Sequence, residues 1–476
     1  MQNETDGLLP KDVQLETGQL ELFSVAISML CSMLIHHWLT TRYAYFHFIG
    51  GSIALFTVEF LSMCLPPLLI HTYFGDNVVL TTAILLSTCF LLCNSTKQLR
   101  CLRTSIFREF KVTTLVSTCI VIAAVDCKRI FASQFAKTQT YGLSPMDMGT
   151  GLFVAVRALD SLRRDLRRSN AFDSAKKASR QVKQQTKESN GFQVPRFLPL
   201  LLIGLARVAF VEFSGYYQNP TEYGTHWNFF ISLALIELLI SFFHMLFQND
   251  LATPIASVLS GLVYFAVLLS TDFEEYLLGT EVSRNGFLDG NREGICSTFG
   301  YLFIFGLTYL SARFFVPSIV WNDSYIQHAT HPNLFYILSR NFLVQAIFYV
   351  ISLYEFGLPS RRVANLTYGL HVSMIVNLII LFMHVYMHCV GDRSPTASLT
   401  SQLPTLHAAI SRHGSYFFLA ANLLTGLLNY SRSYIQTPEL EFASLLLYAF
   451  VLCLSTQFVD VYFTTNTERR TPKLSQ

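Results

Sequence analysis

The chain has 476 residues, of which 51% are apolar and only 14% are charged. Soluble proteins carry roughly 25% charged residues, so this chain has too few charges to cover a water-facing surface. A soluble enzyme, a disordered scaffold and a secreted disulfide module are therefore excluded, and a net charge of +3 gives no electrostatic footprint for nucleic-acid binding. The class that remains is a polytopic membrane protein.

Thirteen apolar segments are candidates for membrane spans, because a bilayer core of ~30 Å needs ~17–25 apolar residues in a helix. They are residues 22–39, 45–70, 77–93, 111–125, 146–160, 197–213, 228–247, 252–270, 297–312, 341–357, 366–390, 414–430 and 441–463. Segments 111–125 and 146–160 are the weakest, and twelve spans remain possible if one of them is re-entrant. We therefore predict an all-α fold in which residues 22–463 form one transmembrane domain, between a polar N-terminus (1–21) and a tail (464–476).

The charges of the loops predict the orientation of these spans. The connection 161–196, the loop 94–111 and the C-terminal tail are basic, whereas the N-terminal segment and the loop 271–296 are acidic. An odd number of spans places the basic segments on the same side of the membrane, so we expect a lumenal N-terminus and a cytosolic C-terminus. The N-terminal segment does not resemble a cleavable signal. Of the sequons at Asn3, Asn94 and Asn322, only that of Asn3 is expected to be glycosylated.

The basic connection 161–196 is rich in Lys, Gln and Ser and has no apolar period. It is predicted to be a solvated cytosolic linker. The alternative is a segment that draws anionic headgroups or phosphates to the membrane surface.

Ionisable residues inside the predicted spans are costly and therefore candidates for function. The candidates are Glu59, Arg207, Glu212 and Glu237. Each of them is expected either to form an interhelical hydrogen bond or to line a substrate cavity. His384 and His388 lie one helical turn apart, but no third zinc ligand accompanies them, so a packed pair is favoured. Most of the ten cysteines lie in apolar runs, where they act as small packing residues. No metal site is expected.

Residues 126–151 are unlike the other connections. They combine Lys128, Arg129 and Lys137 with aromatic residues and glycines. Toward the end of the segment, a helix is expected to begin at Pro145 with Asp147 as a capping residue. The segment is too polar for a span and too aromatic for a linker. Such a composition is typical of a loop at membrane depth that lines a wet cavity.

Four ordered blocks resemble one family. Phe-Ala-Lys-Thr-Gln-Thr-Tyr-Gly-Leu-Ser-Pro-Met-Asp-Met-Gly-Thr-Gly (135–151) is similar to the signature of the glucosaminyl-phosphatidylinositol inositol acyltransferases, the phosphatidylinositol-glycan class W family. The other blocks are Thr-Glu-Tyr-Gly-Thr-His-Trp-Asn-Phe-Phe (221–230), Arg-Asn-Gly-Phe-Leu-Asp-Gly-Asn-Arg-Glu-Gly (284–294), and Ser-Arg-Arg-Val-Ala-Asn (360–365) with Ala-Asn-Leu-Leu-Thr-Gly-Leu-Leu-Asn (421–429). The resemblance runs over nearly the whole chain.

The resemblance implies an enzyme of the endoplasmic-reticulum membrane with thirteen spans. Such enzymes move a long acyl chain, typically palmitoyl, from acyl-CoA to the inositol hydroxyl of glucosaminyl-phosphatidylinositol, on the lumenal side, during GPI-anchor assembly. The family's catalytic pair maps onto Asp126 and Lys137, with an interval one residue longer than is usual. No permanently bound cofactor is implied.

Further residues in and around these blocks are expected to contact the substrates: Tyr141, Asp147, Glu222, His226, Asn228, Arg284, Asn291, Arg292 and Asn422. For Arg284, Asn291 and Arg292 the expected ligand is the inositol phosphate or a CoA phosphate, because Arg matches phosphate bidentately. The alternative is a local ion-pair set with Glu281, Asp289 and Glu293.

The reaction requires a base for the ring hydroxyl, and Asp126 is the candidate. It also requires a donor for the charge that develops on the thioester oxygen, and Lys137 is the candidate, helped by backbone amides around Gly142. Direct transfer needs no acyl-enzyme, although Cys127 beside the base is a possible thioester site. Two other functions stay open: a histidine-type membrane O-acyltransferase that uses His384 or His388, and a secondary transporter, which would show matching halves that we do not find.

Overall fold

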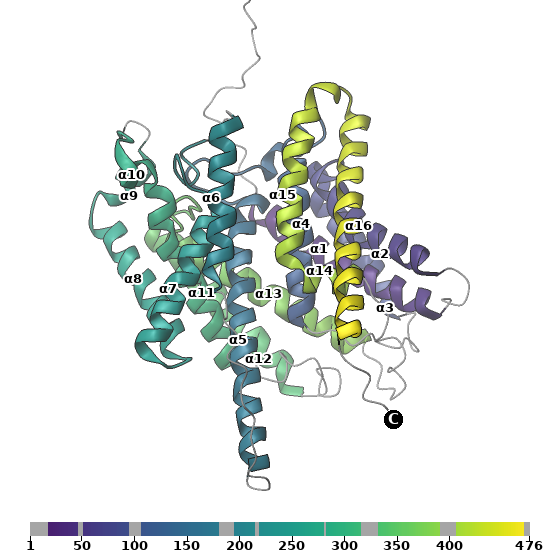
Figure 1. Ribbon diagram of the computed structural model, residues 1–476, viewed down its shortest axis with the longest axis horizontal. Coiled ribbons are helices and arrows are strands. Elements are labelled where there is room, and N and C mark those ends of the chain that lie inside the picture. The colour runs from purple at the N-terminus through teal and green to yellow at the C-terminus, as the bar shows by residue number, and fades with distance from the viewer. Residues whose placement is uncertain are drawn as a thin grey trace, which may run out of the picture. The chain divides into compact units, whose positions relative to one another are not determined.

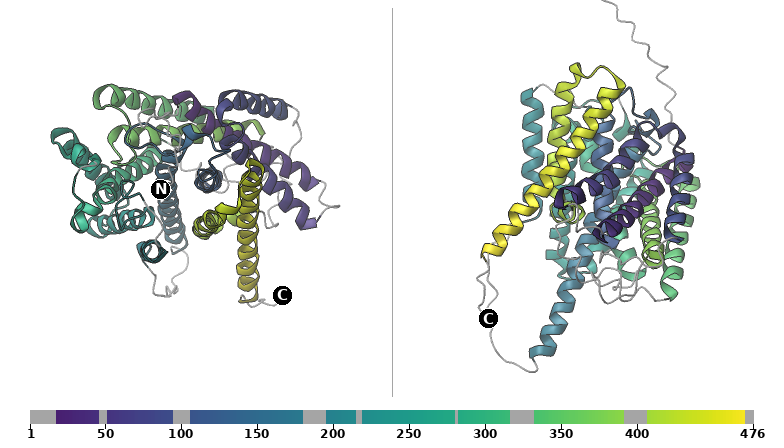
Figure 2. Two further views of the ribbon diagram at one scale, coloured as in Figure 1. Left: turned by 90° about the horizontal axis from the view of Figure 1, so that it is seen from above. Right: turned by 90° about the vertical axis from the view of Figure 1, so that its right-hand side faces the viewer.

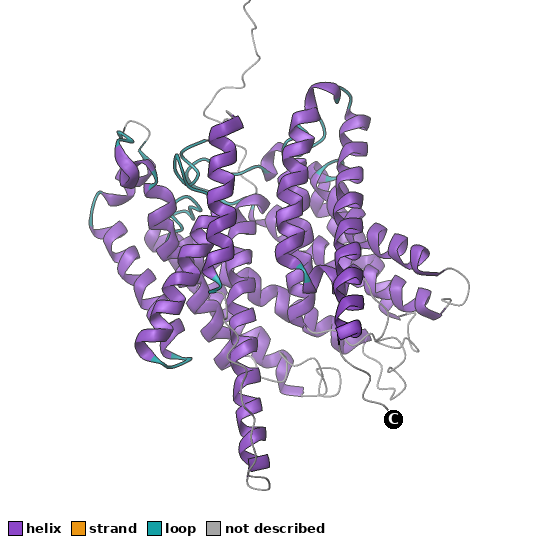
Figure 3. Cartoon of the chain, in the orientation of Figure 1, coloured by secondary structure: helices purple, strands orange, loops and turns teal. Residues whose placement is uncertain are grey.

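The computed structural model describes residues 18–45, 51–94, 106–179, 195–214, 219–279, 282–315, 332–390 and 406–470. Within these ranges all regular elements are helices (Figures 1 and 3). Asn3, Asn322 and the tail after residue 470 lie outside them, and the side chain of His388 is also not described. The expected glycosylation pattern therefore stays a prediction.

The described part of the chain contains thirteen long helices and six short ones. The long helices are α1 (Gln19–Tyr45), α2 (Gly51–His71), α3 (Val78–Asn94), α4 (Ile106–Ala124), α5 (Pro145–Ser179), α6 (Phe197–Ser214), α7 (Phe229–Phe247), α8 (Ala252–Ser270), α11 (Arg292–Phe315), α12 (Pro332–Phe356), α13 (Leu366–Val390), α15 (Gly414–Tyr430) and α16 (Pro438–Arg470). The short ones are α9 (Phe273–Leu278), α10 (Gly286–Gly290), α14 (Leu406–Arg412) and the 3₁₀ turns η1 (Gly75–Asn77), η2 (Ser133–Phe135) and η5 (Ser431–Tyr434). Each predicted apolar segment coincides with one of the long helices.

Nine helices among the described residues are long and apolar enough to cross a membrane: α1, α2, α3, α7, α8, α11, α12, α13 and α16. The other long helices are α4, α5, α6 and α15. Helix α4 carries Arg108, Glu109 and Lys111 near its start, and α15 has only 17 residues. The all-α polytopic class is thus confirmed, whereas the number of thirteen spans and the orientation of the termini stay predictions.

Helix α5 continues well past the predicted end of its span at residue 160. Its bounds, Pro145–Ser179, turn the first half of the predicted linker 161–196 into helix. Leu, Arg, Ala and Lys, which are good helix formers, make up more than half of residues 161–179, and Arg164 pairs with Asp160 one turn earlier. Leu162 is fully buried, so the first turn after residue 160 still packs against the protein. The linker prediction was wrong for this half.

The chain divides into two compact units. Unit 1 consists of Met1–Lys97, Val112–Met148 and Gln402–Gln476, and unit 2 of Gln98–Lys111 and Gly149–Ser401. In unit 1, α1 packs on α2 and α3, and α16 packs on α2, α14 and α15. Helices α15 and α16 lie side by side in every view of Figures 1 and 2. Segments from both ends of the sequence therefore build unit 1.

Unit 2 is held together by close helix packing. The tightest pairs are α8 with α11, α12 with α13, and α6 with α7. A Cβ added to Gly261 would lie 2.4 Å from the Cβ of Phe303, and one added to Gly306 would lie 2.5 Å from the carbonyl oxygen of Pro254. Small residues at such crossings allow membrane helices to approach closely. The sequence therefore needs glycine at these two positions.

Candidate functional site

The loop between α4 and α5 is anchored in unit 1 by buried aromatic packing. Phe135 of η2 is fully buried in an apolar cluster with Val25, Met29, Ile70, Val78 and Ala132. The backbone N–H of Ala132 also donates to the carbonyl of His71 at 3.3 Å. This anchor fixes the loop just before Lys137.

The second anchor of the loop is a capping box at the start of α5. The N–H of Asp147 donates to the Ser144 hydroxyl at 3.2 Å, and the Asp147 carboxylate accepts from the N–H of Ser144 at 3.1 Å. Pro145 follows as the first helical residue, where its fixed φ suits the helix. The predicted capping role of Asp147 is confirmed, with Ser144 as the reciprocal partner.

The buried Asp147 carboxylate also holds Thr138, the residue after Lys137. Oδ2 of Asp147 accepts from the N–H of Thr138 at 3.1 Å and from its hydroxyl at 2.9 Å. Gly142 turns the chain between them with φ of 103°, a left-handed conformation that favours glycine. These contacts give Asp147 a structural role. A direct contact of Asp147 with substrate stays a prediction.

Lys137 therefore emerges from a segment that is fixed on both sides. Its side chain is exposed, as is that of Tyr141 farther along the same loop. Phe135 and Thr138 hold the backbone on either side, so the ammonium group is presented from a rigid base. A cation that is to stabilise charge in a reaction needs such a support.

Asp126 lies two residues after the end of α4 and contacts the end of α15. Its Oδ2 accepts a hydrogen bond from Asn429 Nδ2 at 2.8 Å, and its Oδ1 lies 3.8 Å from Arg432 Nη1. The side chain is 29% exposed, so it remains accessible to a reacting group. Asn422 lies two turns before Asn429 on α15 and donates to the carbonyl of Phe418 at 2.7 Å. The predicted residues Asp126, Lys137, Tyr141, Asp147 and Asn422 thus all belong to unit 1.

The turn that carries Asp126 is tied to α16. The N–H of Arg129 donates to Glu441 Oε2 at 3.0 Å, and Arg129 Nη1 donates to Glu441 Oε1 at 2.8 Å. Glu441 is almost completely buried. The backbone of the turn is therefore fixed independently of the Asp126 side chain.

Cys127, beside the candidate base, is poorly suited to be a nucleophile. The thiol is buried, and burial raises its pKa to about 12, with the nearby Glu441 and Asp126 acting in the same direction and Arg432 opposing them. A thiol with such a pKa remains protonated near neutral pH, whereas thioester formation needs the thiolate. The burial and the raised pKa of this thiol therefore argue against an acyl-cysteine at this position.

Changing Cys127 to Ser should leave turnover close to that of the wild type, because a buried, protonated thiol is not expected to act as a nucleophile. The measurement is acyl transfer by the purified variant, together with a search by mass spectrometry for an acylated wild-type protein. An acyl group trapped on Cys127, or an inactive folded serine variant, would contradict this expectation.

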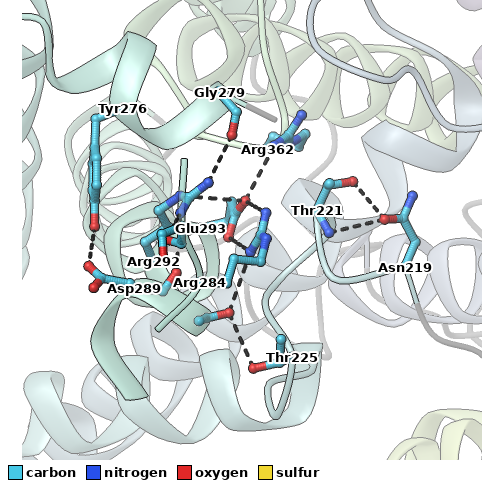
Figure 4. A network of polar contacts seen from close by, with 12 residues as sticks. Asn219, Thr221, Thr225, Tyr276, Gly279, Arg284, Asp289, Arg292, Glu293 and Arg362 are labelled. Carbon is cyan, nitrogen blue, oxygen red and sulfur yellow. Dashed lines mark hydrogen bonds and ion pairs between the residues drawn. The ribbon is translucent and has the colours of Figure 1, made fainter. Parts of the chain in front are cut away.

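A second group of predicted residues surrounds Glu293 in unit 2 (Figure 4). Glu293 is 0% exposed. Arg284 approaches its Oε1 at 2.6 Å and its Oε2 at 3.1 Å, and Arg362 approaches Oε1 at 3.3 Å. Arg292 Nε lies 4.0 Å from Oε1. Burial lowers the pKa of Arg362, an effect that Glu293 opposes. One buried carboxylate therefore faces three guanidinium groups.

Arg292 and Asn291 form hydrogen bonds with backbone groups of neighbouring segments. Arg292 donates to the carbonyl oxygens of Gly279 at 2.9 Å and of Ser283 at 3.3 Å. Asn291 accepts from the N–H of His226 at 2.9 Å and donates to the carbonyl of Phe287 at 2.8 Å. Of the carboxylates in the ion-pair alternative, Glu293 pairs with Arg284, Asp289 accepts from the Tyr276 hydroxyl at 2.6 Å, and Glu281 lies outside the described residues.

Replacing Arg292 by Gln should destabilise unit 2. Buried acceptors left without donors cost about 1–3 kcal/mol each, so the free energy of unfolding should fall by at least that much. The measurement is the thermal unfolding midpoint in detergent. Arg313→Gln, at the exposed end of the same helix, is the matched control and should be neutral. A raised KM with an unchanged unfolding midpoint would instead favour a direct phosphate contact.

The remaining residues of the 221–230 block differ in exposure. Asn228 is buried as the N-cap of α7, accepting from the N–H of Phe230 at 3.0 Å and donating to the carbonyl of Gly204 at 2.9 Å. His226 is half exposed, and its Nδ1 lies 3.1 Å from Glu212. Glu222 is partly buried in the turn before it. Of these, His226 is the most accessible to a ligand.

The ionisable residues predicted inside spans have largely structural partners. Glu237 pairs with Arg157, and Glu59 accepts a hydrogen bond from the N–H of Leu406 at 2.6 Å. Arg207 is exposed on α6, and His384 is buried in α13. The interhelical alternative thus describes Glu59 and Glu237.

Three residues of these sites were not predicted from the sequence. Arg362 stands within the 360–365 block, but nothing in the sequence signals that its side chain reaches Glu293. Asn429 ends the 421–429 block, and Arg432 follows as a lone cation after an apolar run. Only that isolated charge offered a signal, since the partner, Asp126, is about three hundred residues away in sequence.

Comparison with known proteins agrees with the motifs. The GWT1 family model matches residues 14–459. GPI-anchored wall transfer protein 1 of Gibberella zeae is 31% identical over 388 residues, which cover 77% of this chain and 75% of the relative. The protein of the same name from Kluyveromyces lactis is 27% identical over 412 residues, covering 84% and 85%. Mouse glucosaminyl-phosphatidylinositol-acyltransferase PIGW is 28% identical over 394 residues, covering 74% and 72%.

Proposed function

Because this chain belongs to the GWT1 family, we propose that it is an acyltransferase that moves a long-chain acyl group, palmitoyl in the first instance, from acyl-CoA to the inositol hydroxyl of glucosaminyl-phosphatidylinositol. The name of the mouse relative supports both the acyl transfer and the acceptor lipid. The reaction would take place in the endoplasmic-reticulum membrane during GPI-anchor assembly, with the site on the lumenal side. The acyltransferase activity named for the mouse relative argues against the alternative function of a secondary transporter.

The observation that carries the proposal is the accessible carboxylate of Asp126. It lies at the end of α4 on a turn that Arg129 and Glu441 fix, and it keeps 29% of its surface exposed. A general base must reach the proton it removes at about 2.6–3.2 Å, so an exposed carboxylate on a rigid turn suits the task. Lys137 extends from the loop that follows.

In the proposed reaction, the oxygen of the inositol hydroxyl attacks the thioester carbonyl carbon while Asp126 takes the proton of that hydroxyl. A new C–O ester bond forms and the C–S bond breaks. The CoA thiolate leaves and receives the proton from Asp126, so the enzyme returns to its starting state. Lys137 stabilises the negative charge that develops on the carbonyl oxygen.

In unit 2, Arg284 is the most exposed of the three arginines around Glu293. We propose that this guanidinium is the one that meets a substrate phosphate, with Arg292 and Arg362 keeping Glu293 paired behind it. Both Nη atoms of Arg284 donate to Glu293. A bidentate phosphate contact by Arg284 therefore requires Arg292 and Arg362 to take over the pairing of Glu293.

The test is an assay of the purified protein with palmitoyl-CoA and glucosaminyl-phosphatidylinositol. We expect one CoA thiol released for each lipid that gains the mass of one acyl group, and fragmentation should place that group on the inositol. Thiol release without an acylated inositol, or acylation of the glucosamine, would contradict the proposal. Loss of activity on removing His384 with Asp126 dispensable would support the histidine-based alternative.

A further inference from the structure

We propose that Asn429 is a positioning residue for Asp126: its side-chain amide holds the carboxylate in the orientation from which it accepts the proton. This inference rests on the proposed function, in which Asp126 is the general base. It concerns a residue that reaches the site from α15, at the other end of the sequence from α4.

The contact itself is a charge-assisted hydrogen bond. Asn429 Nδ2 lies 2.8 Å from Asp126 Oδ2, within the range of strong N–H to carboxylate bonds. The opposite orientation of the amide would set its oxygen against the carboxylate, so the chemistry of the pair fixes Nδ2 as the atom that faces Asp126. In the described part of the chain, Asn429 Oδ1 is buried and accepts no hydrogen bond. The donor side of the amide is thus directed at the Asp126 carboxylate.

The two oxygens of Asp126 have different surroundings. Oδ2 is occupied by the amide of Asn429, whereas Oδ1 faces Arg432 Nη1 at 3.8 Å, beyond hydrogen-bond distance. A carboxylate oxygen accepts more than one hydrogen bond, so Oδ1 keeps lone pairs for an incoming hydroxyl. The geometry assigns Oδ1 as the oxygen that takes the proton, with Asn429 holding the carboxylate from behind.

The backbone of the turn does not depend on this contact. Arg129 and Glu441 tie the turn to α16 through two hydrogen bonds. Removing the Asn429 amide should therefore free the rotation of the Asp126 side chain while the turn stays in place. A misplacement of about 1 Å at a reacting group costs up to ~10²-fold in rate.

The experiment compares Asn429→Ala and Asn429→Leu with Ser431→Ala. Leu keeps most of the side-chain volume but has no donor. Ser431 lies in the same turn, and its hydroxyl donates to the carbonyls of Leu427 and Leu428. For both Asn429 variants we expect kcat to fall about 10–100-fold, with KM for each substrate and the unfolding midpoint near wild-type values. Ser431→Ala should be unchanged in all three.

A double variant separates positioning from a general structural role. In the Asp126→Asn background, Asn429→Ala should lower the residual rate no further, because Asn429 acts only through the carboxylate. Wild-type kcat in either folded Asn429 variant overturns the inference. So does an unfolded protein in both, since Asn429 would then hold the fold. If Asp126→Asn itself retains full activity, the proposed function of Asp126 has failed instead.

Discussion

Replacing Asp126 by Asn should lower kcat about 10²–10⁴-fold, because the amide keeps the shape of the side chain but cannot accept the proton of the inositol hydroxyl. The folded structure should persist, since the turn that carries Asp126 is held by Arg129 and Glu441. Acyl-CoA binding should also persist, because no contact with the donor is assigned to this carboxylate. The measurement is kcat of the purified variant, with binding of acyl-CoA followed separately.

The matched control for this variant is Asp76→Asn. Asp76 is an exposed carboxylate in η1 of the same unit and has no part in the proposed reaction. It should retain wild-type turnover. Near wild-type turnover in a folded Asp126→Asn protein would falsify the base assignment and direct attention to His226.

Replacing Lys137 by Ala should lower kcat by a similar order, ~10²–10³-fold, because a preorganised cation aimed at the developing oxyanion is lost. Lys137→Arg keeps the charge but replaces a compact ammonium by a planar fork, so only partial activity is expected. Phe135 and Thr138 continue to hold the loop in both variants. The measurement is kcat and KM for each substrate.

Lys128→Ala supplies the control, since Lys128 is an exposed lysine of the same connection without a proposed role. The double variant of Asp126→Asn with Lys137→Ala should be little worse than the poorer single variant, because both residues act on one step. Additive losses would show that the two residues serve separate steps, and a fully active Lys137→Ala would remove Lys137 from the mechanism.

Much of the fold was predictable because membrane helices must satisfy their own backbone hydrogen bonds in a solvent that offers none. Each apolar segment therefore became a helix at the predicted place. Helix α5 departed from the prediction because polar segments also form helices where good helix formers predominate, as Leu, Arg, Ala and Lys do in residues 161–179. Apolar length marks where a helix crosses the membrane and does not mark where the helix ends.

The sequence by itself determined the membrane class, the helix positions, the loop with Lys137 and the capping role of Asp147, because these depend on composition and on residues close in the chain. Tertiary structure alone decided which groups meet. Asn429 reaches Asp126 only because α15 and α16 join unit 1, and Arg362 reaches Glu293 only because α11 lies against α13. The pairing of buried polar groups depends on the distances between them in space, and a single sequence does not give these distances.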